Sequence, residues 1–194
     1  DAALKKYDNL VNRLASITLS SNSKAEFDFF KTYLRSHYAQ DMSQSKGSTS
    51  DFVRIGKEFH RWVRDNSVAL NLKTSDDFFD FIVQLDYFAT KYEKIYSLIQ
   101  QRKTDEFLYL IVNSDYSFTL QPALILASIN YQDDDKVVET KIKIVSKYLT
   151  KVLSWRVWNH TMISQSSMEA KIYDLCKTIR GKTVEELKPY LDSD

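Results

Sequence analysis

Three glycines and two prolines are all that this 194-residue chain contains. Average usage would supply about 12% of residues as glycine or proline, so the residues that form hairpins and tight turns are scarce. The scarcity argues against β-rich folds and against glycine-rich phosphate-binding loops. Hydrophobic residues make up 43% of the chain and charged residues 27%, a balance typical of a globular domain and too rich in charge for a membrane span. We expect an all-α fold without a sheet.

Apolar residues recur at spacings of three and four along the chain, which is the pattern of amphipathic helices. The spacing predicts about nine helices: from about 3 to 18, from 23 to 38, from 51 to 66, from 74 to 101, from 104 to 112, from 122 to 131, and three more that start at 133–135, 166 and 183. Capping boxes mark three of the starts: Ser23 with Glu26, Ser166 with Glu169, and Thr183 with Glu186.

The helix that ends near residue 101 is long and contains no glycine or proline, so we expect it to be a central packing element with Phe88 and Tyr92 buried. No motif recurs at a fixed period, which favours an irregular multi-helix bundle over a solenoid. We expect one helical domain over 1–194, with sub-lobes 1–70 and 74–194 as an alternative. The polar segment 41–50 is expected to be a flexible loop.

The chain starts at Asp1 inside an amphipathic segment that lacks the apolar run of a signal peptide, so we expect it to be a fragment of a larger protein. Its 27 basic and 26 acidic side chains give a net charge of +1, and any binding to nucleic acid must come from a local patch. Cys176 is the single cysteine, which excludes an internal disulfide and fits the cytoplasm.

No catalytic constellation is visible in the sequence. His37, His60 and His160 lie too far apart to share a metal ion from one helix, and the acidic run 133–135 is better suited to a helix start than to a divalent ion. Cys176 follows apolar positions of a helix and is expected to be a buried, inert thiol. We therefore expect no catalytic residue, no metal and no cofactor in this segment.

The segment 136–160 is the most informative for function. Lys136, Lys143, Lys147 and Lys151 project to one face of the predicted helix, and Trp158 projects to the same face. Lysines beside an aromatic ring can follow a phosphate backbone and stack on a base. The alternative is a solvated lysine-rich face without a partner.

Arg156 projects into the apolar stripe of the same helix, where an unpaired charge is costly. Three explanations stay open. The helix bends before it, or its guanidinium reaches a carboxylate or backbone carbonyls inside the fold, or it faces a partner domain.

Three blocks of the sequence resemble GmrSD-type modification-dependent restriction proteins. Residues 26–38 resemble the aromatic helix that opens the helical part of those proteins, and residues 86–92 with Ile95 resemble a pattern in the middle of that part. Residues 142–156, followed by 172–175, resemble a later helix and a short helical hairpin. The blocks span most of the chain and are patterns of packing residues.

In that family a ParB-like domain with an Asp-Gly-Gln-Gln-Arg motif is linked to nucleotide hydrolysis, and an HNH domain cuts DNA. Neither motif occurs here, so the resemblance transfers no catalytic residue. It implies a helical module that packs against and regulates the nucleotide-binding and nuclease domains of the same parent chain and contacts DNA. The parent would then be an NTP-dependent endonuclease. The alternative is a protein interaction domain without a DNA role. Neither membrane binding nor an oligomeric state is indicated.

Overall fold

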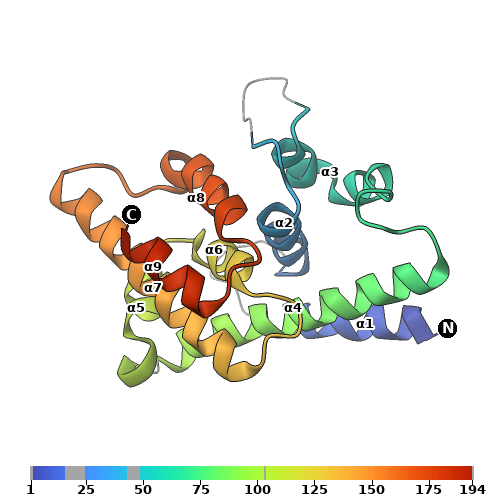
Figure 1. The fold of residues 1–194 in the computed structure, drawn as a ribbon, viewed down its shortest axis with the longest axis horizontal. Coiled ribbons are helices and arrows are strands. Elements are labelled where there is room, and N and C mark those ends of the chain that lie inside the picture. Colours follow the sequence, from blue (N-terminus) through green and yellow to red (C-terminus); the bar gives the residue numbers. More distant parts are fainter. Residues whose placement is uncertain (1, 16–24, 43–48, 103, 194) are drawn as a thin grey trace. The chain divides into compact units, whose positions relative to one another are not determined.

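The computed structural model describes residues 2–15, 25–42, 49–102 and 104–193. Within these ranges it contains nine helices and no strand, which confirms the all-α prediction (Figure 1). The helices are α1 (Ala2–Ala15), α2 (Ala25–His37), α3 (Asp51–Asp65), α4 (Ser75–Gln101), α5 (Thr104–Asp115), α6 (Gln121–Ser128), α7 (Asp135–Trp158), α8 (Gln165–Ile179) and α9 (Val184–Ser193).

The helices group into two compact units, Asp1–Glu93 and Lys94–Asp194. The boundary falls inside α4 and not in the segment 70–74, where the sequence suggested a division. A continuous helix gives no local signal of such a boundary, because its apolar positions persist across it.

The N-terminal unit has an aromatic core. Helix α2 packs against both α1 and α3. Phe29 lies 5.4 Å from Tyr92 and Tyr33 lies 4.9 Å from Phe88, measured between ring centroids. All four side chains are buried, which confirms the prediction for Phe88 and Tyr92. The first part of α4 therefore supplies core residues to this unit.

The ends of the predicted 41–50 loop are fixed by contacts with α3. The backbone amides of Gln40 and Asp41 donate to Asp51 Oδ2 at 2.9 and 3.3 Å, and Trp62 Nε1 donates to Asp51 Oδ1 at 2.8 Å. Burial of the Asp51 carboxyl opposes ionisation, yet these donors together hold its pKa below the usual value. Residues 43–48 lie outside the described ranges, and the flexibility expected there stays a prediction.

Helix α6 is the most deeply buried element of the C-terminal unit. Every residue from Gln121 to Ser128 is buried. Helix α6 packs against α7 and α8, and α7 also packs against α5 and α9 (Figure 1). A helix that is covered on all sides loses the polar face that marks an amphipathic pattern. The sequence pattern therefore could not indicate that α6 lies at the centre of this unit.

The capping boxes show how far local pattern determines helix starts. Thr183 and Glu186 form the expected pair, since the Thr183 amide donates to Glu186 Oε2 at 2.9 Å and the Glu186 amide donates to Thr183 Oγ1 at 3.4 Å. The box predicted for Ser166 with Glu169 is wrong. Ser164 caps α8 instead, in a reciprocal box with Ser167. Ser23 lies outside the described residues.

Candidate nucleic-acid interface

Helix α7 positions the predicted lysine row. Its start is fixed by Asp134, whose side chain accepts a hydrogen bond from the Val137 amide at 2.8 Å. Its apolar side is fully buried in the C-terminal unit and consists of Val138, Ile142, Val145, Leu149 and Leu153. Burial of this side turns the opposite side of α7 outward.

All four predicted lysines are exposed, and two of them have acidic neighbours in the unit. Lys143 Nζ lies 3.7 Å from Glu106 Oε2 and 4.9 Å from the centre of the Phe107 ring. Lys151 Nζ lies 3.3 Å from Asp192 Oδ1. Lys136 and Lys147 form no ion pair with any described residue. The lysine row, residues 136, 143, 147 and 151, is accessible but partly neutralised.

A fifth lysine of α7 has a structural role that the sequence analysis missed. Lys141 is fully buried, and its Nζ donates to Asp133 Oδ2 at 2.7 Å. The same carboxylate accepts the Asn130 amide at 2.8 Å. A buried ammonium needs such a partner, because desolvation of an unpaired charge is costly. The acidic run 133–135 thus fixes the start of α7, as expected.

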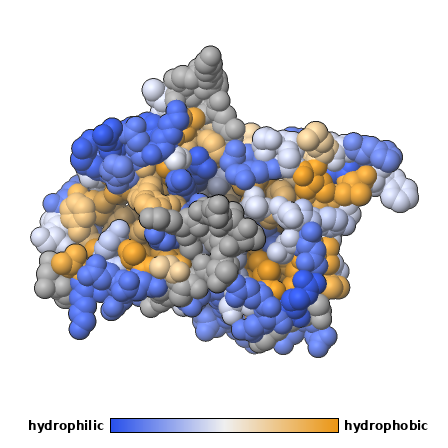
Figure 2. Space-filling model, turned by 180° about the vertical axis from the view of Figure 1, so that it is seen from behind, coloured by the Kyte–Doolittle hydropathy of each residue, from blue (hydrophilic) through white to orange (hydrophobic). Residues whose placement is uncertain are grey.

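The C-terminal end of α7 exposes large apolar side chains. Trp158 is 85% exposed and Trp155 is 64% exposed, with Val157 and Met162 also at the surface. We call these four residues the α7 end patch. Figure 2 shows that apolar side chains reach the surface in patches between hydrophilic ones on the face it draws. Exposed tryptophan is unusual on a surface that has no partner.

Arg156 fixes the turn that follows α7. Its Nε and Nη2 donate to the Met162 carbonyl at 3.0 and 2.7 Å, and its own carbonyl accepts the Thr161 amide at 2.8 Å. The guanidinium therefore has a backbone carbonyl as its partner, but in the exposed turn after α7 and not inside the fold. The Arg156 side chain is half-buried.

A shallow cleft lies beside the lysine row, between α5 and α7. Its volume is about 250 Å³, and Phe107, Leu110 and Ile144 give it an apolar lining. Lys143 and Lys147 stand at this cleft. The sequence could not indicate it, because its walls come from two helices some forty residues apart in the chain.

The remaining candidates from the sequence have structural surroundings. His37 packs on Tyr33 and Phe88, with ring centroids 4.7 and 4.4 Å away, while His60 and His160 are exposed. Cys176 is buried, and its Sγ donates to the Ala123 carbonyl at 3.7 Å. Burial raises the pKa of the Cys176 thiol, so the thiolate needed for nucleophilic attack is disfavoured.

Among the described residues, no group of three or more histidine, cysteine, aspartate or glutamate side chains is arranged to hold a metal ion. No helix in these ranges combines the length and apolar character that a bilayer crossing requires. Comparisons with protein-family models, curated proteins and solved structures give no match for this chain.

Proposed function

We propose that this chain is a non-catalytic helical module of a bacterial DNA-modification-dependent restriction protein, which acts in the cytoplasm. The module packs against and regulates the nucleotide-binding and nuclease domains of the same protein, and it contacts DNA through α7. The sequence resemblance to GmrSD-type proteins motivates the first part of the proposal. Its three blocks correspond to α2, to the middle of α4, and to α7 with α8.

The observation that carries the DNA contact is the exposed lysine row with Trp158 on the same helix. Spacings of seven, four, four and seven residues keep these five side chains on one side of a continuous helix. Ammonium groups on such a row can release counterions from a phosphate backbone, which is the main source of affinity in sequence-independent binding.

The acidic neighbours of Lys143 and Lys151 do not prevent this contact. Both ion pairs are exposed, with about half of each side chain in water. Exposed pairs of this kind contribute about 0–1 kcal/mol, so a phosphate can replace the carboxylate. Lys136 and Lys147 are expected to contribute most, because they give up no partner.

A protein interaction domain without a DNA role is the second candidate. The α7 end patch favours it, because exposed tryptophan, valine and methionine side chains are more typical of protein interfaces than of a surface that binds a phosphate backbone. In that case the lysines only keep the surface solvated. Both candidates use α7, and they differ in whether the lysine row binds DNA.

Fluorescence anisotropy with a labelled duplex separates the two candidates. The proposal predicts that the variant with Lys136, Lys143, Lys147 and Lys151 all changed to Gln binds at least tenfold more weakly than the wild type. A matched control changes four exposed lysines elsewhere to Gln, namely Lys57, Lys73, Lys171 and Lys188. This control alters the net charge equally and should keep most of the affinity. If both variants lost the same amount of affinity for the duplex, the effect would come from net charge alone, and the proposed interface would be rejected.

A further inference from the structure

The C-terminal end of α7 stands clear of the unit to which it belongs. Leu153 is the last fully buried residue of this helix, and from Ser154 to Met162 every residue except Arg156 is exposed. Figure 1 shows this end of α7, and the segment that leads from it to α8, at the edge of the C-terminal unit. The α7 end patch is therefore a protrusion and not a flat surface.

Hydrogen bonds within the chain hold this protrusion in a defined shape. The Asn159 amide donates to the Trp155 carbonyl at 3.0 Å. The two bonds from the Arg156 guanidinium to the Met162 carbonyl place the following turn against the last turn of α7. The exposed apolar side chains are thus presented by an ordered turn.

The sequence around the protrusion is basic. Residues 140–168 include four lysines and one arginine, and no aspartate or glutamate. Two of these five groups are engaged inside the unit, since Lys141 pairs with Asp133 and Arg156 donates to a carbonyl. The others stay exposed, and they are Lys143, Lys147 and Lys151. The net charge of +1 for the whole chain conceals this local excess of positive charge.

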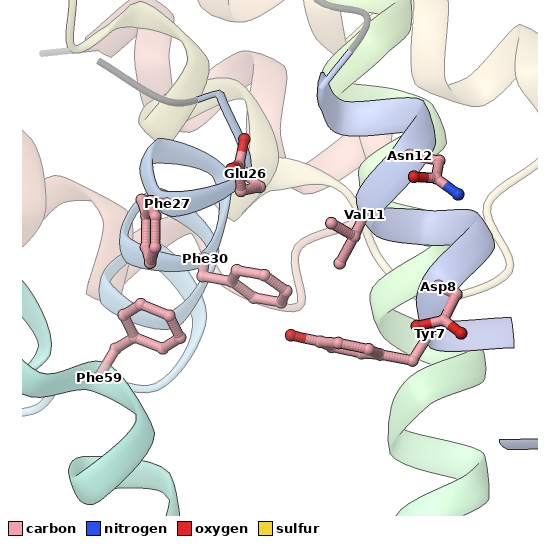
Figure 3. Close-up of a pocket in the computed structure, with 8 residues that line it drawn as sticks. All are labelled: Tyr7, Asp8, Val11, Asn12, Glu26, Phe27, Phe30 and Phe59. Atoms are coloured by element: carbon pink, nitrogen blue, oxygen red, sulfur yellow. The ribbon is translucent and has the colours of Figure 1, made fainter. Parts of the chain in front are cut away.

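The aromatic pocket of the N-terminal unit differs from this protrusion. Residues of α1, α2 and α3 line it, and its volume is about 430 Å³ (Figure 3). Its rings pack on one another: Tyr7 lies 6.4 Å from Phe30, Phe30 lies 5.3 Å from Phe59, and Phe59 lies 6.0 Å from Phe27, measured between centroids. The two indoles of the α7 end patch are more exposed than any of these rings. They stay in water until a partner covers them.

We propose that the α7 end patch docks on an anionic lipid bilayer. Tryptophan prefers the boundary between headgroups and acyl chains, and neighbouring lysines are attracted to anionic headgroups. A helix rises by 1.5 Å per residue, so Lys151 lies about 6 Å from Trp155 along the axis of α7. The headgroup layer is about 5–8 Å thick on each side of a bilayer. Lys151 therefore reaches the headgroups when Trp155 lies at their inner boundary.

Other partners fit this protrusion less well. A duplex meets the lysines with phosphates but offers no apolar surface to the indoles, because its bases are stacked inside. A second protein must supply a hollow of matching shape, since the centres of protein interfaces are closely packed. A bilayer needs no such match, because an apolar side chain enters between its headgroups.

Vesicle binding tests the proposal on the full chain. The probes are vesicles of phosphatidylcholine alone and of phosphatidylcholine mixed with phosphatidylserine. We expect the chain to bind the anionic vesicles at least tenfold more tightly than the neutral ones in cosedimentation, and high salt to weaken this binding. Tryptophan emission should shift to shorter wavelength, and brominated lipid should quench it. Trp62 is 3% exposed, so its emission should stay constant.

A double variant connects the binding to the patch. Trp155→Ser with Trp158→Ser should lower the affinity for anionic vesicles at least tenfold. Phe78→Ser with Phe79→Ser is the matched control, because both phenylalanines are exposed on α4 in the N-terminal unit. This control should bind vesicles as the wild type does. Thermal melts show whether both variants fold, which is expected because exposed side chains contribute little to stability.

The contribution of charge is tested by changing Lys147 and Lys151 together to Gln. This variant should lose most of the preference for anionic over neutral vesicles, because it removes the two exposed lysines nearest to the patch. A wild-type chain that binds both kinds of vesicle equally would exclude recognition of anionic lipid.

Three further results would overturn the proposal. The first is the absence of binding to either kind of vesicle. The second is equal vesicle binding by the wild type and the double tryptophan variant, or emission that brominated lipid does not quench. The third is a wild-type dimer in sedimentation that dissociates in the double tryptophan variant, since a second copy would then cover the patch. None of these measurements involves nucleic acid, so their outcome is independent of the proposed DNA contact.

Discussion

Trp158 has the most exposed large apolar side chain in the part of the chain described here, and it stands at the end of the lysine row. Its indole has two faces available for stacking. Single-stranded nucleic acid offers unstacked bases to such a ring, whereas duplex DNA keeps its bases stacked inside the helix. Whether the nucleic acid is single-stranded or a duplex should therefore decide how much Trp158 contributes to binding.

We predict that Trp158→Ala weakens binding to single-stranded DNA by about 1–3 kcal/mol, the usual contribution of one base stacked on an aromatic ring. Duplex affinity should be nearly unchanged. Trp158→Phe keeps an aromatic face and should restore most of the loss. Anisotropy titrations with one labelled strand, alone and annealed, provide the measurement. Equal losses on both substrates would show that Trp158 does not stack on bases.

Cys176 gives a prediction about pH. An exposed thiol in the unfolded chain has a pKa of about 8.5, whereas burial raises the pKa of Cys176 in the folded state. Above the unfolded pKa the unfolded chain loses a proton that the folded chain keeps, so stability must fall as pH rises. Below that pKa both states hold the proton and the effect is absent.

From pH 7.5 to pH 9.5 this group alone should lower the free energy of unfolding by about 1 kcal/mol. Cys176→Ala lacks the titrating group and should lose correspondingly less over the same interval. Urea unfolding of both proteins at the two pH values checks this. Tyr33 also has a raised pKa, mainly through burial, but its unfolded value lies above this pH window. Parallel pH dependence of the two proteins would argue that Cys176 is not buried as described.

At the scale of elements, α5, α6 and α7 are joined by a buried polar network. Asn113 Nδ2 donates to Gln121 Oε1 at 2.7 Å and to the Ser146 carbonyl at 2.9 Å. Thr150 Oγ1 donates to Asn113 Oδ1 at 2.8 Å, and Gln121 Nε2 donates to the Leu110 carbonyl at 3.0 Å. Asn113 and Gln121 are fully buried. Each partner lost in such a network leaves a polar group without water or protein to bond.

Asn113→Ala should therefore destabilise the chain by about 2–4 kcal/mol, since it removes three hydrogen bonds and leaves their partners buried. Thr150→Val should cost less, and the double variant should cost less than the sum of the two, because both act on one network. Urea unfolding gives all three values. A cost below about 1 kcal/mol for Asn113→Ala would mean that water enters and replaces the side chain.

Phe88 tests the role of α4. It is 2% exposed and contacts Tyr33 and His37 through its ring. Phe88→Ala should cost about 3–5 kcal/mol, the usual penalty for such a deletion in a core. Phe79 lies on the same helix but is 38% exposed, and Phe79→Ala should cost less than about 1 kcal/mol. Thermal melts of both variants provide the comparison, and an unchanged melting temperature for Phe88→Ala would contradict the assignment.

Helix positions were largely predictable from sequence because amphipathic spacing is a local property. The start of α8 was not predictable in this way. Ser164 and Ser166 each precede a polar side chain, Ser167 and Glu169, by three residues, so the local pattern fits both and the structure shows the first. Burial of Lys141 was not predictable either. Its partner Asp133 lies eight residues away and precedes the helix, beyond the reach of a side-chain pair within one helix.

At the scale of the whole molecule, the chain carries a net charge of +1, so long-range attraction to DNA is weak and only a local row can bind it. The lysine row belongs to the C-terminal unit and the aromatic pocket belongs to the N-terminal unit. The row could be predicted because its members share one helix. The pocket could not, because its rings come from three helices that the sequence does not bring together.

The salt dependence of duplex binding tests the central claim most directly. Each phosphate contact contributes about 0.9 to the slope of log affinity against log salt concentration. Lys136 and Lys147 form no ion pair with a described residue, while Lys143 and Lys151 form ion pairs with Glu106 and Asp192. We predict that the wild-type slope exceeds that of the four-glutamine variant by about 2 to 4. Identical slopes for the two proteins would contradict the claim that this face of α7 contacts DNA.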